Sequence, residues 1–275
     1  MVQLAPNLAM TLKNLAGFGA VISAEQQAAL DHSLPIKRTE AGLKSLTLWG
    51  KITTQNGKDY LLAEGSNEPL LTVDGHVQFD AKYYFSLDGV KWVDLQAIDQ
   101  STSQRAAQVK STLIGDPAKA YEVVEDDPNA PPAPTEPAEG EEAAEGPKKL
   151  VFQIPELAVL RYRLDSINTT CGVIPVNSVL PNAMNRIVSN RMFPGISYPE
   201  KLESYTHRNT PPSGPTLAAD LRGTWSVNYD PFKQISAVRS LLYPGYTFYY
   251  AGHDATWGAM YVGDGNRNDD LIFML

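Results

Sequence analysis

The sequence has few of the residues from which covalent and metal-bound frameworks are built. Cys171 is the single cysteine in 275 residues, so the chain cannot form an internal disulfide. A lone thiol without a histidine motif is more typical of a core or surface residue than of a nucleophile, and it fits a reducing compartment. The four histidines, His32, His76, His207 and His253, form no H-x-x-x-H pair, so the sequence predicts no metal site.

Signatures of nucleotide and calcium sites are missing or incomplete. No G-x-x-x-x-G-K-[ST] phosphate loop occurs. The glycines at 263 and 265 begin like a dinucleotide fingerprint, but Asn268 replaces the third glycine and no helix can follow. The same stretch begins like a calcium loop, with Asp269 in place of the glycine and Leu275 in place of the last acidic ligand. We therefore predict no catalytic residue, no cofactor and no metal, although paired carboxylates in a cleft leave no signature.

Positive charge is not in excess over the chain, whose formal net charge is −8. Residues 125–147 hold eight of the 31 acidic residues and no basic residue, which leaves 23 acidic against 23 basic residues elsewhere. The balanced remainder offers no basic patch, so we predict neither nucleic acid nor membrane as a partner. Lys13 interrupts the apolar first 22 residues, and we expect neither a signal peptide nor a membrane span there.

The acidic segment also contains six of the 20 prolines and no aromatic residue. Such a composition cannot bury enough apolar area to offset the entropy of ordering, so we predict a disordered loop over 125–147. The loop divides the chain into an N-terminal half, residues 1–124, and a C-terminal half, residues 148–275, which we expect to pack as one unit. A solvated spacer is the favoured interpretation of the loop, and a partner-binding acidic element is the alternative.

Aromatic residues make up 9% of the chain but are dense near its end. Seven of them lie in the 20 positions from Tyr243 to Val262. The stretch 243–246, Tyr-Pro-Gly-Tyr, is typical of a type II turn, because proline presets φ and glycine accepts a positive φ. Aromatic and β-branched runs follow at 246–250 and 257–262 with turn residues between them, so we predict a C-terminal β-meander.

Earlier parts of the chain combine hairpin signals with amphipathic helices. Asn-Gly at 56–57 and Asp-Gly at 88–89 each separate two apolar runs and predict β-hairpins. Leucines at helical spacing and a possible Ser23/Gln26 capping box predict two short N-terminal helices. Further helices are predicted over 101–113, 155–166 and about 198–205, the last from an S-x-x-E box, and strands over 149–154 and 225–229. Hairpins in runs with short helices set apart predict an α+β fold with largely antiparallel sheets.

The last five residues, 271–275, are apolar and follow a Gly-Asp-Gly-Asn turn at 263–266. Such a terminus gains most by completing a sheet, where its backbone groups pair and Leu271, Phe273 and Leu275 share one face. We expect it to pair within the chain's own sheet, because the turn returns it toward the preceding strand. Pairing with a partner's sheet is the alternative.

Three motifs near the C-terminus are specific: RSLL-x-PG-x-TFY at 239–249, YVG-x-G at 261–265 and N-x-DL-x-FML at 268–275. Together they resemble the radial spoke head protein nine family of motile cilia. Positions 49–50, 92, 115–117, 174–175 and 225–226 also match, while Tyr243 and Ile272 stand where we expect Trp and Pro. The resemblance implies a non-enzymatic subunit of the axonemal radial spoke head. It also implies binding to spoke head proteins of the four and six type, and mechanical signalling between the central pair and the dynein arms.

The residues themselves also favour contact with other proteins as the function, because interfaces are enriched in large aromatic side chains. Neighbours in a strand point to opposite faces, so the aromatic residues of the meander are not all expected to face the core. Two alternatives remain: a cytosolic adaptor that binds through the acidic loop, and an enzyme whose cleft has no sequence signature. The partner-binding candidates are Tyr243, Tyr249, Tyr250, Trp257, Tyr261 and Phe273.

Overall fold

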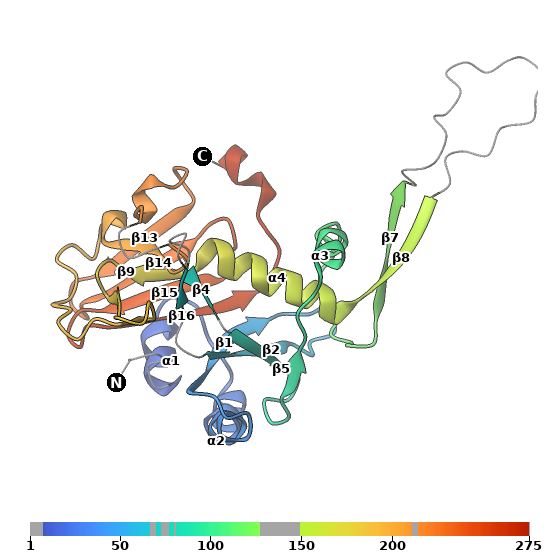
Figure 1. The fold of residues 1–275 in the computed structure, drawn as a ribbon, viewed down its shortest axis with the longest axis horizontal. Coiled ribbons are helices and arrows are strands. Elements are labelled where there is room, and N and C mark those ends of the chain that lie inside the picture. The colour runs from blue at the N-terminus through green and yellow to red at the C-terminus, as the bar shows by residue number, and fades with distance from the viewer. Residues whose placement is uncertain are drawn as a thin grey trace, which may run out of the picture.

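The computed structural model describes residues 8–66, 70–72, 77–79, 81–126, 149–210 and 214–274. Its largest sheet has eight strands, drawn from both halves of the sequence (Figure 1). The strands are β1 (Ser45–Ile52), β2 (Tyr60–Ser66), β5 (Ala81–Ser86), β6 (Val93–Leu95), β13 (Trp225–Asp230), β14 (Ile235–Ser240), β15 (Tyr246–Ala251) and β16 (Thr256–Gly263). Their order is β13-β14-β15-β16-β1-β2-β5-β6. The predicted α+β class with largely antiparallel sheets is confirmed.

The predicted hairpins and meander form antiparallel ladders. β1 pairs with β2 and β5 with β6 around the Asn-Gly and Asp-Gly turns, and β13 to β16 pair in sequence order. The expected turn at 243–246 is present, because the Tyr246 N–H donates to the Tyr243 carbonyl at 3.2 Å and Gly245 has a φ of 107°. A Cβ on Gly245 would lie 2.3 Å from the Val262 carbonyl oxygen, so no other residue fits this turn.

The two halves of the sheet meet at a parallel contact that the sequence did not predict. β1 and β16 pair through Gly50 with Tyr261, Lys51 with Val262, and Ile52 with Gly263. Short two-stranded ladders lie outside the main sheet. They pair β3 (Leu70–Leu71) with β4 (Val77–Gln78), β9 (Val173–Pro175) with β12 (Tyr205–His207), and β10 (Val179–Pro181) with β11 (Ile187–Ser189).

Helices cover both faces of the main sheet (Figure 1). α1 (Leu8–Ala16) and α2 (Ala24–Glu40) lie on one face, and α4 (Glu156–Cys171) crosses the other. The predicted cap of α2 is confirmed, since the Ser23 hydroxyl accepts the Gln26 N–H at 3.2 Å. α2 continues through Pro35 and is longer than the short helix we expected. The predicted helix at 155–166 is α4, which runs on to Cys171.

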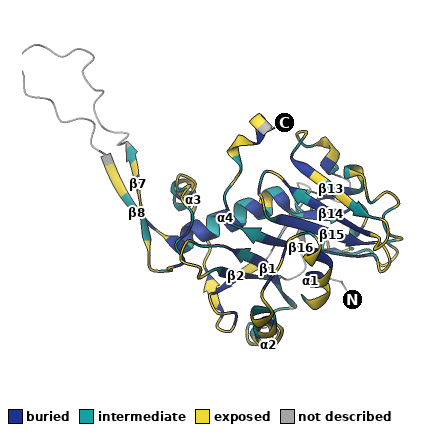
Figure 2. Cartoon of the chain, turned by 180° about the vertical axis from the view of Figure 1, so that it is seen from behind, coloured by how far each residue is buried: buried dark blue, intermediate teal, exposed yellow. Residues whose placement is uncertain are grey.

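The core is divided by the sheet into two layers. The layer beneath α4 contains Leu62, Leu160 and Phe248, whereas the layer beneath α1 and α2 contains Leu15 and Leu61. Figure 2 shows β14, β15, β1 and β2 as buried along most of their length. Both faces of these strands are therefore internal. Alternation of apolar and polar residues would instead have indicated one buried face and one exposed face.

β7 (Ala120–Asp126) and β8 (Lys149–Pro155) form an arm that projects from the body (Figures 1 and 2). β8 confirms the strand predicted over 149–154. The predicted loop 125–147 begins too early, because Glu125 pairs with Leu150 in the ladder and also forms an ion pair with Arg105 at 3.2 Å. Its remaining residues, from 127 onward, lie outside the described part of the chain.

One predicted helix is shorter than expected. α3 (Gln100–Ala106) ends seven residues before the predicted position 113. The Arg163 guanidinium donates hydrogen bonds to the carbonyls of Val109 and Ser111. The Leu113 carbonyl accepts the Gln55 N–H at 2.9 Å. These tertiary hydrogen bonds replace the helical ones, so propensity over 107–113 is overridden.

The helix predicted over 198–205 is wrong. This stretch contains only the 3-10 turn η1 (Leu202–Ser204), and a second such turn, η2 (Leu217–Ala219), follows later. The Pro199 carbonyl accepts hydrogen bonds from the Tyr205 and Ser236 hydroxyls, both at 2.7 Å. The carbonyl that a helix would use is therefore bonded to β14 and to the start of β12.

The strand predicted at the C-terminus is also wrong, since residues 269–274 form the 3-10 helix η3 (Asp269–Met274). At its C-terminal end, β16 has β15 on one side and β1 on the other, so the chain that leaves the turn at 263–266 finds no free edge there. Leu271 is buried at 5% exposure and Phe273 is 87% exposed, so these two side chains do not share a face. Leu275 lies outside the described residues.

We propose that the two halves fold as one unit, because four strands of the main sheet come from each half. A site for a sequence-specific protease, inserted within 127–148, tests this proposal. After cleavage the two fragments are expected to elute together from a sizing column under native conditions and to melt in one transition. Fragments that separate without denaturant would show two independent domains.

Candidate functional site

The predicted partner-binding residues fall into two groups. Tyr243, Tyr249, Tyr250 and Tyr261 are each at most 4% exposed, whereas Trp257 is partly exposed and Phe273 is almost fully exposed. We expected that Tyr249, Tyr250, Trp257 and Tyr261 would not all face the core; the three tyrosines are buried, and Trp257 is the one of the four that is partly exposed. In this conformation only Trp257 and Phe273 have surface to offer a partner, and partner contact by any of the six remains a prediction.

The buried tyrosines connect loops and helices to the sheet through their hydroxyl groups. Tyr249 meets the Thr11 hydroxyl of α1 at 3.4 Å, and Tyr250 accepts the Ile196 N–H at 2.9 Å. Tyr261 accepts the Gly265 N–H at 2.8 Å, and burial raises its pKa. A buried hydroxyl without a partner would destabilise the fold, so these contacts let large aromatic side chains fill both layers of the core.

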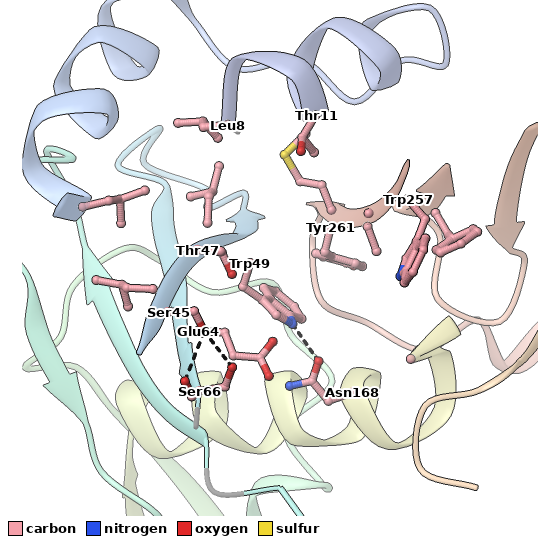
Figure 3. A pocket seen from close by; sticks show the side chains of 18 of the residues that line it. Leu8, Thr11, Ser45, Thr47, Trp49, Glu64, Ser66, Asn168, Trp257 and Tyr261 are labelled. Carbon is pink, nitrogen blue, oxygen red and sulfur yellow. Dashed lines mark hydrogen bonds between the residues drawn. The ribbon is translucent and has the colours of Figure 1, made fainter. Parts of the chain in front are cut away.

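A pocket of about 540 Å³ lies between β1 and β16. Leu8 and Thr11 of α1 lie on one side of it, and Glu64 and Asn168 lie on the other (Figure 3). Every residue from 45 to 49 and from 257 to 261 lines it, so it is bounded by the backbones of two strands as well as by side chains. Its volume is in the range of pockets that hold ligands of moderate size.

The polar side of the pocket is internally paired. The Trp49 indole N–H donates to Asn168 Oδ1 at 2.7 Å, and Asn168 Nδ2 donates to the Tyr83 hydroxyl at 2.9 Å. Arg208 donates from both terminal nitrogens to the Glu64 carboxylate at 3.0 and 3.3 Å. The charges on this side therefore cancel, and no charged group here lacks a counter-charge.

A second polar centre, which the sequence reasoning missed, lies at the base of the arm. The Glu156 carboxylate is fully buried and accepts the Tyr60 and Tyr121 hydroxyls, each at 2.7 Å. It also accepts three backbone N–H groups, from Ile114, Gly115 and Asp116, at 2.8 to 3.1 Å. This one side chain joins β2, β7, α4 and the loop at 114–116.

The electrostatics of Glu156 follow from these contacts. Burial raises its pKa, but the hydrogen bonds from Tyr121, Tyr60 and the backbone outweigh burial and hold the pKa below its usual value. Burial and the bond to Glu156 raise the pKa of Tyr121 to about 12. The available signals were a carboxylate in the first turn of a helix and the Gly-Asp-Pro at 115–117, and neither specifies a buried contact.

The arm carries exposed apolar side chains. Val124, Leu150 and Val151 are 51%, 42% and 58% exposed. The arm is tied to α3 by Arg105, whose guanidinium lies 3.5 Å from the centre of the Phe152 ring and pairs with Glu125. A two-stranded ladder on its own is only marginally stable in water, so these apolar residues form a surface suited to contact with another protein.

Groups suited to chemistry are few in the part of the chain that the structure describes. No three His, Cys, Asp or Glu side chains among the described residues are placed to hold a metal ion. None of the described helices is long and apolar enough to cross a membrane. By its fold, the chain is an α+β protein with an eight-stranded sheet between helices and a projecting arm that exposes apolar side chains.

Relatives narrow this class further. The Radial spoke head protein 9 homologs of Xenopus tropicalis, Bos taurus and Homo sapiens are each 30% identical to the chain. The likeness covers 98% of the chain and 99% of each relative. No family model matches the sequence. The chain belongs to the radial spoke head protein 9 family, and the resemblance seen in the C-terminal motifs is confirmed.

Proposed function

We propose that this chain is a structural, non-enzymatic subunit of the radial spoke head in the axoneme of motile cilia. The observation that carries the proposal is the likeness to Radial spoke head protein 9 homologs over 98% of the chain. Residues of the shared motifs have structural roles here that support it. Gly245 permits a turn that no other residue fits, and Tyr249 fills the core beneath α1.

The proposed partners are spoke head proteins of the four and six type, with the central pair apparatus facing the head surface. The exposed apolar residues of the arm, Val124, Leu150 and Val151, and the exposed Phe273 are surfaces on which such partners can dock. The proposed role is to pass mechanical signals from the central pair toward the dynein arms. A sheet packed on both faces suits that role, because close-packed interiors deform little and transmit strain.

Replacement of the chain in ciliated cells tests this function. Cells that lack their own copy receive the tagged chain, and their axonemes are then isolated after the membrane is removed. We expect the chain to remain with the axoneme, to co-purify with spoke head proteins and to restore normal beating. A chain that is absent from axonemes, or cilia that beat normally without it, would contradict the proposal.

Shortening the acidic segment separates this function from the adaptor alternative. Residues 127–147 are replaced by a short Gly-Ser linker, which leaves every described residue of β7 and β8 in place. We expect the melting temperature to change by no more than a few degrees and spoke head binding to persist, because the composition of the segment favours a spacer. Loss of partners with unchanged melting would favour the adaptor.

A further inference from the structure

The pocket lies where β1 and β16 diverge within the main sheet, and we call this divergence the fork. The two strands pair with each other only over 50–52 and 261–263, at their C-terminal ends. Toward their starts, residues 45–48 still pair with β2 and residues 256–260 still pair with β15. No described strand lies between these two stretches, and the pocket occupies the space (Figure 3).

The apex of the fork is built by two residues. The pairing of β1 with β2 is irregular between Leu48 and Gly50, so Trp49 is an extra residue that bends β1. Gly50 has a φ of 156°, and a Cβ there would lie 2.2 Å from the Tyr261 carbonyl oxygen. The Trp49 ring stacks on Tyr261 with 5.4 Å between ring centres. These contacts bring the strands together at the apex and let them diverge from it.

The walls of the fork are strand edges, and this decides what fits between them. A strand directs its N–H and C=O groups alternately to its two neighbours, so part of the backbone over 45–49 and 256–260 faces the pocket. Backbone groups without partners in a partly buried site are costly, and water or another chain must satisfy them. An extended polypeptide can pair with both edges at once.

The side chains around the fork suit an uncharged segment with alternating character. Leu30 and Leu34 of α2 and Met260 form an apolar wall on one face, and Asp31 and Arg38, which carry opposite charges, line the pocket beside them. The other face presents the paired Glu64 and Arg208, which carry no net charge. Successive residues of an inserted strand point to opposite faces, so apolar and small polar residues would alternate. Five positions of strand span about 16 Å, which limits the inserted segment to about five residues.

We propose that this fork accepts an extended, uncharged segment of a neighbouring polypeptide, which pairs with β1 and β16 as an inserted strand. The inference rests on the proposed function, since it states how a spoke head partner would bind this chain. Main-chain pairing would supply affinity, and the difference between the apolar face and the polar face of the pocket would select the side chains of the inserted segment.

Hydrogen exchange of the full chain, alone and in isolated spoke heads, tests the inserted strand. The pocket-facing amides of 45–49 and 256–260 are expected to exchange at least about tenfold more slowly in the assembled head. The amides of β14, which already has a strand on each side, serve as the control and should not change. Unchanged exchange at both edges within assembled heads would overturn the inference and leave the proposed function intact.

Filling the fork is the second test. Ala259→Trp places a large ring among the residues that line the pocket, and Ala28→Trp is the matched control on the exposed side of α2. We expect Ala259→Trp to keep a cooperative melting transition and to lose at least tenfold in binding to purified spoke head partners, while Ala28→Trp binds normally. A folded Ala259→Trp chain with normal binding would overturn the inference. The exchange experiment decides the case if Ala259→Trp does not fold.

Discussion

Replacing either Tyr249 or Tyr250 by alanine is expected to lower the free energy of unfolding by about 3 to 5 kcal/mol. The two side chains point to opposite faces of β15, yet both are at most 2% exposed. Tyr249 packs in the layer beneath α1 and α2, and Tyr250 packs in the layer beneath α4. Each truncation removes a large ring from a closed layer, so chemical denaturation of the purified chain should show two similar losses.

Two kinds of control variant show how much of this loss comes from the buried ring. One removes only the hydroxyl group, and the other truncates an exposed tyrosine. Phenylalanine at 249 or 250 keeps the ring and removes one hydrogen bond, which is expected to cost about 1 kcal/mol. Tyr198→Ala, at a side chain that is 58% exposed, should change stability by no more than about 0.5 kcal/mol. An unchanged melting temperature in Tyr249→Ala would mean that α1 does not cover this face in solution.

Local signals predicted those parts of the fold whose partners are close in sequence. The turns at 56–57, 88–89 and 243–246 are specified by residues that accept their backbone angles, and each turn joins two strands that pair with each other. The Ser23 cap was visible for the same reason. Backbone angles and short loops are properties of the sequence itself, so these elements could be predicted without knowledge of the rest.

The parts that could not be predicted depend on distant residues. β1 and β16 lie about 200 positions apart in sequence, and their parallel contact occupies the edge that the C-terminal residues were expected to join. α1 covers the second face of β15, so Tyr249 and Tyr250 are both core residues although they point to opposite faces. Likewise, Arg163 hydrogen-bonds two backbone carbonyls within 107–113 that a helix would use for its own hydrogen bonds. In each case a tertiary contact overrode a local preference.

The candidate surfaces were predictable to a smaller degree. Trp49-Gly50 was noted as a shared motif, but its role as a bulge at the apex of a fork needs the position of Tyr261. Glu156 carried no signal beyond its place at a helix start. Of the six residues proposed from aromatic density, only Trp257 and Phe273 keep exposed surface. Aromatic density indicated packing, and sequence alone could not separate packing within the chain from packing between chains.

Glu156→Ala is expected to cost about 3 to 5 kcal/mol of folding stability and to loosen the arm from the body. The substitution leaves two tyrosine hydroxyls and three backbone N–H groups without their acceptor in a site closed to solvent. Each unsatisfied buried donor carries a desolvation penalty, and water that enters the new cavity recovers only part of it. Glu122→Ala, at an exposed position of β7, is the matched control and should change stability by no more than about 0.5 kcal/mol.

The pH dependence of Glu156→Gln tests whether the charge itself matters. Glutamine keeps the shape but offers one acceptor oxygen, so at pH 7 it should cost about 1 to 3 kcal/mol. The pKa of Glu156 is lower in the folded chain than in the unfolded chain, so its charge stabilises the fold above pH 4 to 5. That contribution is lost as the pH falls through the folded pKa. The difference in stability between the natural chain and Glu156→Gln, measured by denaturant unfolding from pH 7 to pH 3, should therefore shrink on acidification. A constant difference would show that folding does not lower the pKa of Glu156, and a difference that grows would show that the pKa is raised and that the fold favours the neutral carboxyl group.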